Sequence, residues 1–226
     1  MAPISVVTGA NRGIGLSLCA KLKSKGYQVI ASCRITSKEL DALGVQVVEG
    51  VDVGRDGGCA PLAASLGSRK VDLLVCNAGV LIEDTLADLD IAKLREQFEV
   101  NTLGPLRTYL AVKDSIGQGS KIAIITSRMG SIADNGSGGD YGYRMSKAAV
   151  NMLGTNLAVD LKAGGVAVGI LHPGFVATDM TKKYHGMDGV IDPEQSAADL
   201  VEIMEQQLSM ETSGTFWHRN GTVLPW

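Results

Sequence analysis

Tyr143 and Lys147 are the two residues whose types and spacing point most directly to chemistry. In an α-helix, residues four apart lie on the same face, one turn above the other. An ammonium close to a phenol favours its ionised form, which lowers the phenol pKa from its ordinary value of about 10. A phenol tuned in this way can exchange a proton with a carbonyl or an alcohol. The pair by itself also fits an ordinary surface contact, so its meaning depends on the rest of the sequence.

A glycine-rich turn follows the first expected strand. Glycines allow a tight turn, bring backbone N–H groups close to a pyrophosphate, and let the next helix pack against the strand. The amino terminus of that helix also attracts an anion. The spacing Gly-x-x-x-Gly-x-Gly therefore predicts a phosphate-binding turn, although the same glycines without a ligand would form a simple turn. After the strand Ile4–Thr8 the residues are Gly9, Ala10, Asn11, Arg12, Gly13, Ile14 and Gly15.

Apolar segments rich in β-branched residues recur along the chain, with helical stretches between most of them. Such alternation predicts an α/β fold: a doubly wound parallel sheet of the Rossmann type, with about seven strands flanked by helices. Ligands bind at the carboxyl ends of the strands in this topology. We expect one domain over residues 1–226. The expected strands are Ile4–Thr8, Gln28–Ser32, Val45–Gly50, Val71–Cys76, Lys121–Thr126, Val166–His172 and Gly214–Trp217.

Composition narrows the function classes. The chain has 226 residues, of which 45% are apolar, and 21 basic against 24 acidic residues give a formal charge of −3. The absence of a Lys/Arg run argues against nucleic acid, and no apolar run reaches the length of a membrane span. Because the first strand begins by Ile4, no room remains for a cleavable signal, and we expect a cytoplasmic protein. The four cysteines and three histidines lack metal-ligand spacing, so no metal site is expected.

Several further motifs occur in the order typical of one enzyme family. The motifs are Thr8-Gly9-x-x-x-Gly13-x-Gly15, Asp52-Val53, Cys76-Asn77-Ala78-Gly79, Asn101, Thr126-Ser127, Tyr143-x-x-x-Lys147 and Pro173-Gly174. Together they resemble the short-chain dehydrogenase/reductase family over essentially the whole chain, and within it the branch of small carbonyl reductases that includes the C-factor and sniffer proteins.

The resemblance implies roles for the catalytic residues. Tyr143 would give a proton to the substrate oxygen, and Lys147 would hold the nicotinamide ribose. Asn101 matches the residue whose backbone carbonyl holds a water linked to the lysine. The family serine usually lies twelve or thirteen residues before the tyrosine, which fits Ser131, whereas Ser127 directly follows a strand. We choose Ser127, because strand-end geometry should hold better than loop length, and keep Ser131 as the alternative.

Charge favours NADP(H) over NAD(H). The second strand ends at Arg34 without the acidic residue that usually binds the ribose 2′-hydroxyl. Arg34, together with Arg12 in the glycine turn, resembles the two basic positions that grip a 2′-phosphate. The alternative is that Arg34 is a solvated cation and Arg12 only caps the loop.

The resemblance implies further cofactor contacts. Asp52 would accept a bond from the adenine amino group, and Val53 would add a backbone contact; alternatively, Asp52 caps the next short helix. Small residues after the fourth strand would lie against the adenine ribose, and the Asn77 amide would also tie neighbouring strands together. The nicotinamide carboxamide would be reached from the segment that contains Pro173, Gly174, Val176 and Thr178.

The sequence therefore predicts an NADPH-dependent carbonyl reductase, with a reversible alcohol dehydrogenase using the same residues. The alternative function is a dinucleotide-binding signalling or sensor protein with weak or vestigial catalysis, as in the C-factor branch. The glycine-rich segment 135–140 is expected to form a loop beside the active site, and the segment Asp179–Ile191 a short lid. The partner is a small carbonyl or alcohol substrate, and a homodimer or homotetramer is possible through the helices that carry Asn101 and Tyr143.

Overall fold

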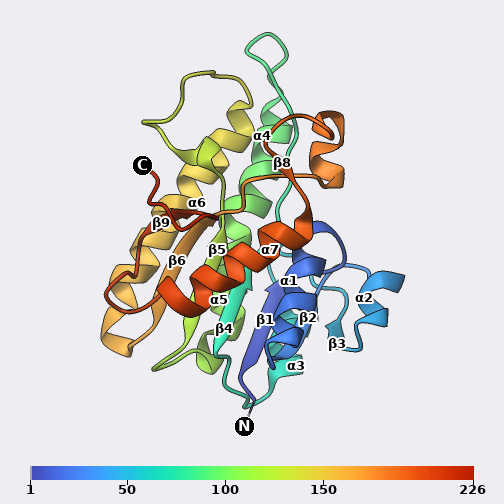
Figure 1. Cartoon of the computed structure of the whole chain (residues 1–226), viewed down its shortest axis with the longest axis vertical. Coiled ribbons are helices and arrows are strands. Elements are labelled where there is room, and N and C mark those ends of the chain that lie inside the picture. Colours follow the sequence, from blue (N-terminus) through green and yellow to red (C-terminus); the bar gives the residue numbers. More distant parts are fainter. Residues whose placement is uncertain (1) are drawn as a thin grey trace.

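The computed structural model describes residues 2–226, and a seven-stranded parallel sheet forms its centre (Figure 1). The strand order is β3-β2-β1-β4-β5-β6-β9, so the direction of winding reverses between β1 and β4. All six neighbouring pairs are parallel. The predicted doubly wound sheet is confirmed. Its strands are β1 (Ile4–Thr8), β2 (Gln28–Ser32), β3 (Gln46–Val48), β4 (Leu73–Cys76), β5 (Lys121–Ile125), β6 (Ala167–His172) and β9 (Phe216–His218).

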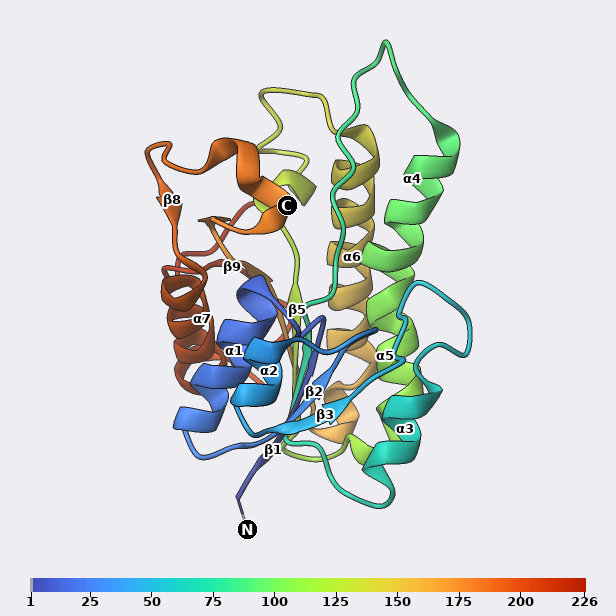
Figure 2. The same ribbon diagram turned by 90° about the vertical axis from the view of Figure 1, so that its right-hand side faces the viewer.

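Helices cover both faces of the sheet (Figure 2). One layer contains α1 (Gly13–Ser24), α2 (Lys38–Ala42) and α7 (Pro193–Glu202), and the other contains α3 (Ala60–Leu66), α4 (Ile91–Phe98), α5 (Gly104–Val112) and α6 (Tyr141–Asp160). None of the helices within residues 2–226 is long and apolar enough to cross a bilayer.

The two layers enclose two apolar clusters, one on each side of the sheet. Successive side chains of a strand point to opposite faces, so Leu73 and Val75 of β4 join the cluster beneath α1 and α7, whereas Leu74 joins the one beneath α5 and α6. All four residues of β4 are buried. A parallel sheet covered on both faces needs strands that are apolar throughout, which explains why the strands were visible as short apolar segments.

Short elements that the sequence did not predict lie beyond β6. The strand β7 (Phe175–Val176) pairs in parallel with β8 (Val190–Ile191), and the 3₁₀ segment η5 (Asp179–Tyr184) lies between them. Of these elements, η5 and β8 lie in the segment Asp179–Ile191 that was expected to form a lid, and β7 precedes it.

Candidate active site

A cleft of about 1650 Å³ lies at the carboxyl ends of the strands. Of the residues that the sequence analysis assigned to the site, only Asn101 does not line this cleft. The assigned residues that do line it are Gly9, Asn11, Arg12, Gly13, Ile14, Gly15, Arg34, Asp52, Val53, Asn77, Ala78, Gly79, Ser127, Tyr143, Lys147, Pro173, Gly174, Val176 and Thr178.

The phenol and the ammonium lie together in the cleft. Helix α6 carries both residues, and the Lys147 Nζ lies 5.6 Å from the centroid of the Tyr143 ring. The same Nζ donates a hydrogen bond to the Ile125 carbonyl, at the end of β5, over 3.1 Å. Lys147 is only 4% exposed, so this contact fixes a desolvated cation at the edge of the sheet.

Burial changes the pKa of both groups. It raises the pKa of Tyr143 to about 12, an effect that the Ser127 hydroxyl partly offsets and the Asp140 carboxylate reinforces. It lowers the pKa of Lys147 to about 8. The sequence predicted a lowered Tyr143 pKa, and this prediction is wrong here, because the cost of removing the phenolate from water exceeds what the Ser127 hydroxyl returns. Tyr143 is therefore a protonated phenol at neutral pH, which is the form that donates a proton.

The two candidate serines occupy different environments. Ser127 follows β5, lines the cleft, and is close enough to Tyr143 to influence its pKa. Its Oγ also accepts a hydrogen bond from the Met129 N–H over 3.2 Å. Ser131 is 2% exposed, and its Oγ accepts from the Asp134 N–H over 3.1 Å. Ser131 does not line the cleft.

Asn101 lies behind the cleft in the π-helical turn η1 (Glu99–Leu103), which joins α4 to α5. Its Oδ1 accepts from the Val80 N–H and its Nδ2 donates to the Val80 carbonyl, both over 2.8 Å. A Cβ added to Gly79 would lie 3.2 Å from the Asn101 Oδ1 and 3.7 Å from the Lys147 Nζ. The absence of a side chain at Gly79 thus lets Asn101 and Lys147 approach each other across the backbone. Single-turn π-helices occur frequently at functional sites.

The glycine turn has room for a ligand only because it lacks side chains. Gly9 and Gly13 have φ values of 65° and 53°, which favour glycine. A Cβ at Gly15 would lie 2.2 Å from the Gly9 carbonyl oxygen, so the helix can pack there only as glycine. A Cβ at Gly13 would lie 3.2 Å from the Thr178 Cγ2, across the cleft. These distances fit the predicted phosphate-binding turn, with α1 starting at Gly13.

Asn77 ties the ends of β1 and β4 together, as predicted. Its Nδ2 donates to the Thr8 carbonyl over 3.0 Å, and its N–H donates to the Thr8 Oγ1 over 3.0 Å. The Ala78 N–H reaches the same Oγ1 over 3.1 Å. The point where the winding of the sheet reverses is therefore rigid.

The two arginines differ in their surroundings. The Arg12 Nη1 forms an ion pair with the Asp179 Oδ2 over 2.6 Å, with both side chains largely exposed. No described residue forms an ion pair or a side-chain hydrogen bond with the Arg34 guanidinium, which lines the cleft beyond β2. The interpretation of Arg12 as a simple loop cap misses this link to η5, which brings together residues 167 positions apart.

Asp52 does not cap a helix, so that alternative is wrong. Helix α3 begins at Ala60, after Cys59. The Asp52 Oδ1 instead accepts from the Gly54 N–H over 3.0 Å, and its Oδ2 pairs with the Arg55 Nε over 3.3 Å. This short turn keeps Asp52 and Val53 at the wall of the cleft.

Sequence reasoning did not assign several residues that line the cleft. The His172 Nδ1 is buried and has no hydrogen-bond partner among the described residues, and burial lowers its pKa to about 3. Glu83 binds η5, because its Oε1 accepts from the Lys183 Nζ over 2.5 Å and from the Tyr184 hydroxyl over 3.2 Å. The expected loop beside the site also lies there, since Ser137, Gly138 and Asp140 line the cleft.

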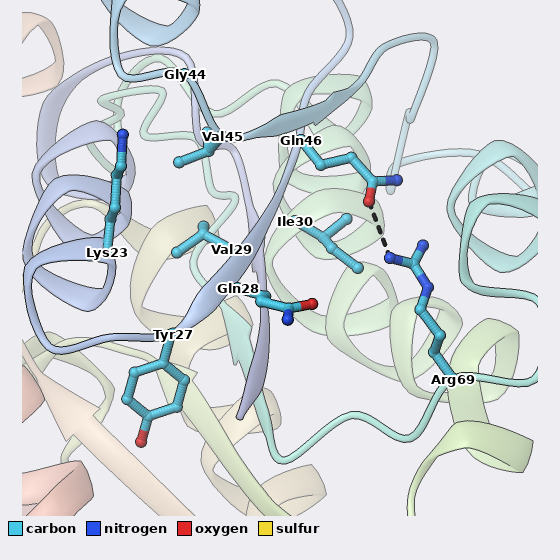
Figure 3. Close-up of a pocket in the computed structure, with 9 residues that line it drawn as sticks. All are labelled: Lys23, Tyr27, Gln28, Val29, Ile30, Gly44, Val45, Gln46 and Arg69. Atoms are coloured by element: carbon cyan, nitrogen blue, oxygen red, sulfur yellow. Dashed lines mark hydrogen bonds between the residues drawn. The ribbon is translucent and has the colours of Figure 1, made fainter. Parts of the chain in front are cut away.

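A second hollow, of about 220 Å³, lies at the opposite end of β2 (Figure 3). Its two cations already bind protein oxygens: the Lys23 Nζ donates to the Leu43 carbonyl, and the Arg69 Nη1 to the Gln46 Oε1 over 3.0 Å. It therefore offers no free charge to a ligand.

Within residues 2–226, no three His, Cys, Asp or Glu side chains gather as a metal site would require.

Comparison with known proteins agrees with this geometry. The family model described as short chain dehydrogenase matches residues 3–188. The chain belongs to the short-chain dehydrogenase family. A 1-hydroxy-2-glutathionyl-2-methyl-3-butene dehydrogenase of Rhodococcus sp. is 46% identical over 98% of both chains. The C-signal protein of Myxococcus xanthus is 40% identical over 73% of this chain and 98% of its own.

The fold comparison leads to the same family. A crystal structure of an NADPH-bound carbonyl reductase from chicken fatty liver has a TM-score of 0.91 and 27% identity, over 100% of this chain and 99% of that one. The predicted resemblance to the small carbonyl reductases and to the C-factor branch is therefore confirmed. This short-chain dehydrogenase is an oxidoreductase.

Proposed function

We propose that this short-chain dehydrogenase is an NADPH-dependent carbonyl reductase that also oxidises the corresponding alcohols. The observation that carries the proposal is the meeting of the Tyr143 phenol, the Ser127 hydroxyl and the Lys147 ammonium in one cleft with the glycine turn. Two hydroxyl donors at one point can bind and neutralise a substrate oxygen that gains negative charge.

Each residue has a distinct task in this proposal. The Ser127 and Tyr143 hydroxyls hold the substrate oxygen, and Tyr143 gives it a proton. Lys147, fixed by the Ile125 carbonyl, holds the ribose hydroxyls and keeps a positive charge next to the phenol. Asn101 fixes the segment after β4 and offers its backbone carbonyl to a proton path towards solvent. NADPH, when bound, supplies the hydride.

The cleft fits NADP(H) in its charge and its shape. The glycine turn offers backbone N–H groups at the start of α1 to the pyrophosphate. The Arg34 guanidinium, two residues after β2, complements a 2′-phosphate, and no carboxylate follows that strand before Glu39. Support also comes from the similar carbonyl reductase of chicken fatty liver, which holds NADPH.

Loss of NADPH absorbance in the presence of quinones, aldehydes, diketones and simple ketones tests the proposal. We expect consumption with at least one class, together with formation of the matching alcohol in equal amount. Binding of NADPH without turnover of any substrate, in either direction, would contradict the proposal.

A specific substrate class is favoured for the alcohol direction. The relative with 46% identity, which matches this chain over nearly its full length, is a dehydrogenase of a glutathionyl alcohol. Side chains of both charges line the cleft, among them Arg128, Arg144 and Asp140. Arg128 pairs with Asp134, and Glu83 pairs with Lys183, so the charged ends of a zwitterionic peptide group could exchange with these ion pairs. The test is oxidation of a primary alcohol carrying a glutathionyl substituent, compared with the same alcohol carrying a methylthio group. Equal kcat/KM for both would argue against this class.

The signalling alternative rests on the similarity to the C-signal protein. The complete set of Ser127, Tyr143 and Lys147 favours an active enzyme instead. The NADPH assay separates the two functions, since a sensor would bind the cofactor and consume no substrate.

We further propose that the chain works as one domain in the cytoplasm, without membrane or nucleic acid partners. All four cysteines are free and buried, as expected in a reducing compartment.

A homodimer or homotetramer through α6 is supported by Met145, Met152 and Val159, which are exposed and seven residues apart. Light scattering on the purified protein measures the number of subunits.

A further inference from the structure

The helix that carries Tyr143 does not cap its own amino terminus. Helix α6 begins at Tyr141, and the preceding Asp140 makes no capping bond with its side chain. Asp140 also has φ and ψ values of 46° and 47°, a left-handed conformation that disfavours residues other than glycine. The first N–H groups of a helix have no partner inside the helix. Since Tyr143 lies in this first turn, the groups that bind the turn also set the position of the phenol.

Asp84 supplies the missing partners from a distant part of the chain. Its Oδ1 accepts from the Tyr141 N–H over 2.6 Å, and its Oδ2 from the Gly142 N–H over 3.0 Å. The Asp84 carbonyl accepts from the Asp140 N–H over 3.0 Å, which holds the strained residue in place. Asp84 is 7% exposed. Charge-assisted bonds shielded from water, made by an anion at the positive end of a helix, are strong and directional.

Two side-chain amides hold the segment that presents Asp84. The Gln97 Oε1 accepts from the Ile82 N–H and its Nε2 donates to the Ile82 carbonyl, both over 3.0 Å. Asn101, one turn further along, binds Val80 in the same manner. The two amides thus bind alternate residues of the extended segment, much as a neighbouring strand would. Asp84 lies two residues after Ile82, so the hydrogen bonds that fix this segment also restrict the position of Asp84.

Gly142 brings these groups directly against the backbone of α6. A Cβ at Gly142 would lie 2.3 Å from the Gln97 Nε2 and 3.2 Å from the Asp84 Oδ2. No side chain therefore fits between the helix and its cap. Neither Asp84 nor Gln97 lines the cleft, so these two residues do not contact a ligand bound there.

We propose that Asp84 is a positioning residue for the reaction, which fixes the first turn of α6 and with it the Tyr143 phenol. This inference rests on the proposed function of Tyr143 as proton donor. Because the glycine turn and Arg34 belong to other elements, loss of Asp84 lowers kcat and leaves the KM for NADPH nearly unchanged. A displacement of about 1 Å at a reacting group can reduce the rate about a hundredfold.

The test compares the variants Asp84→Ala and Asp84→Asn with the wild type. We expect Asp84→Ala to lower kcat about 10- to 100-fold, with the KM for NADPH within about twofold. Asp84→Asn keeps the shape and one oxygen acceptor, so it should recover most of the lost kcat. The matched control is Asp90→Ala, because the Asp90 carboxylate caps α4 by accepting from the Ala92 N–H over 2.8 Å. The Asp90 carboxylate forms no hydrogen bond with α6, and Gln97 lies seven residues further along α4, so removal of this cap should leave kcat unchanged.

The outcomes separate this inference from the proposed function. Wild-type kcat in Asp84→Ala, or equal losses in Asp84→Ala and Asp90→Ala, would overturn the positioning role. A parallel rise in the KM for NADPH would also overturn it. If Asp84→Ala does not fold, the variants Asp84→Asn and Gly142→Ala replace it in the test. The added methyl group of Gly142→Ala displaces Asp84 and Gln97 from the start of α6, so the positioning role predicts a lower kcat with an unchanged KM for NADPH. Unchanged turnover in Tyr143→Phe would instead overturn the proposed function and leave the contacts of Asp84 without a catalytic purpose.

Discussion

The Lys147 ammonium lies 5.6 Å from the centroid of the Tyr143 ring, one turn away on the same helix. Burial favours the neutral form of both groups, because it raises the pKa of Tyr143 to about 12 and lowers that of Lys147 to about 8. At neutral pH the phenol is therefore protonated and can donate a proton to a substrate oxygen. The Lys147 ammonium is still charged at this pH but loses its charge at a pH only slightly higher. The first two predictions follow from this relationship.

Replacing Tyr143 with phenylalanine removes only the hydroxyl. We expect turnover to fall about 10²- to 10⁴-fold, since this is the usual contribution of a positioned proton donor. NADPH binding, measured by the change in nicotinamide fluorescence, should remain within about twofold. Turnover above a tenth of the wild-type value would exclude Tyr143 as the donor.

Lys147→Met should stabilise the protein while abolishing its activity. Below pH 8 the native and unfolded states both carry the proton on Lys147, so the full cost of burying the charge weakens the fold. Between pH 8 and the ordinary Lys pKa of 10.5 the native state releases this proton while the unfolded state keeps it, and the cost disappears. We expect Lys147→Met to increase the free energy of unfolding by about 1–3 kcal/mol at pH 7, and by much less at pH 10. Urea denaturation at the two pH values measures the difference.

A surface variant provides the control for this experiment. Lys162 is exposed, so Lys162→Met should change the free energy of unfolding by less than about 0.5 kcal/mol at both pH values. If Lys147→Met increases the free energy of unfolding equally at pH 7 and at pH 10, added apolar packing stabilises the variant, and not the removal of a buried charge.

Arg34→Asp should shift the cofactor preference towards NAD(H). The substitution replaces a cation that complements the 2′-phosphate with an anion that repels it and can bind a ribose 2′-hydroxyl. We expect the ratio of kcat/KM for NADPH to that for NADH to fall about 10- to 100-fold, as for loss of a charged hydrogen bond. The control Arg95→Asp makes the same change of charge at an exposed position of α4. Equal shifts in the two variants would attribute the preference to net charge alone.

Asp179→Asn should strengthen NADPH binding by releasing Arg12. The two side chains form an exposed ion pair over 2.6 Å, and Asp179 thus competes with a 2′-phosphate for the guanidinium. Exposed pairs contribute about 0.2–1 kcal/mol, so the dissociation constant should decrease by a factor of up to about five. The effect should disappear in the double variant that also contains Arg12→Ala. An effect that persists there would mean that Asp179 acts on the cofactor directly.

Two single variants test whether Ser127 or Ser131 is the catalytic serine. Ser127→Ala should lower kcat about 10²- to 10³-fold, the usual loss for one donor to a developing oxyanion. Ser131→Ala should leave kcat within about threefold, because its hydroxyl accepts a bond from the Asp134 N–H and does not line the cleft. The opposite pattern would assign the reaction to Ser131.

Local sequence pattern was sufficient for the fold and for most of the site. The strands of a parallel sheet are buried on both faces, so each appears as a short apolar segment, and all seven expected segments overlap the observed strand by most of its residues. The glycine turn and the Tyr143-Lys147 pair were visible because their geometry depends on residues a few positions apart. Interactions between residues a few positions apart can be predicted from the sequence, because the local backbone geometry alone brings these residues together.

Tertiary structure alone decided the contacts between distant segments. It placed Ser127 rather than Ser131 at the cleft, paired Arg12 with Asp179, and brought Asp84 onto a helix that begins 57 positions later. It also reversed the expected change in the Tyr143 pKa. The physical reason is the same in each case: burial and long-range hydrogen bonds arise only when the layers pack around the sheet, and no local pattern encodes which polar groups will then meet.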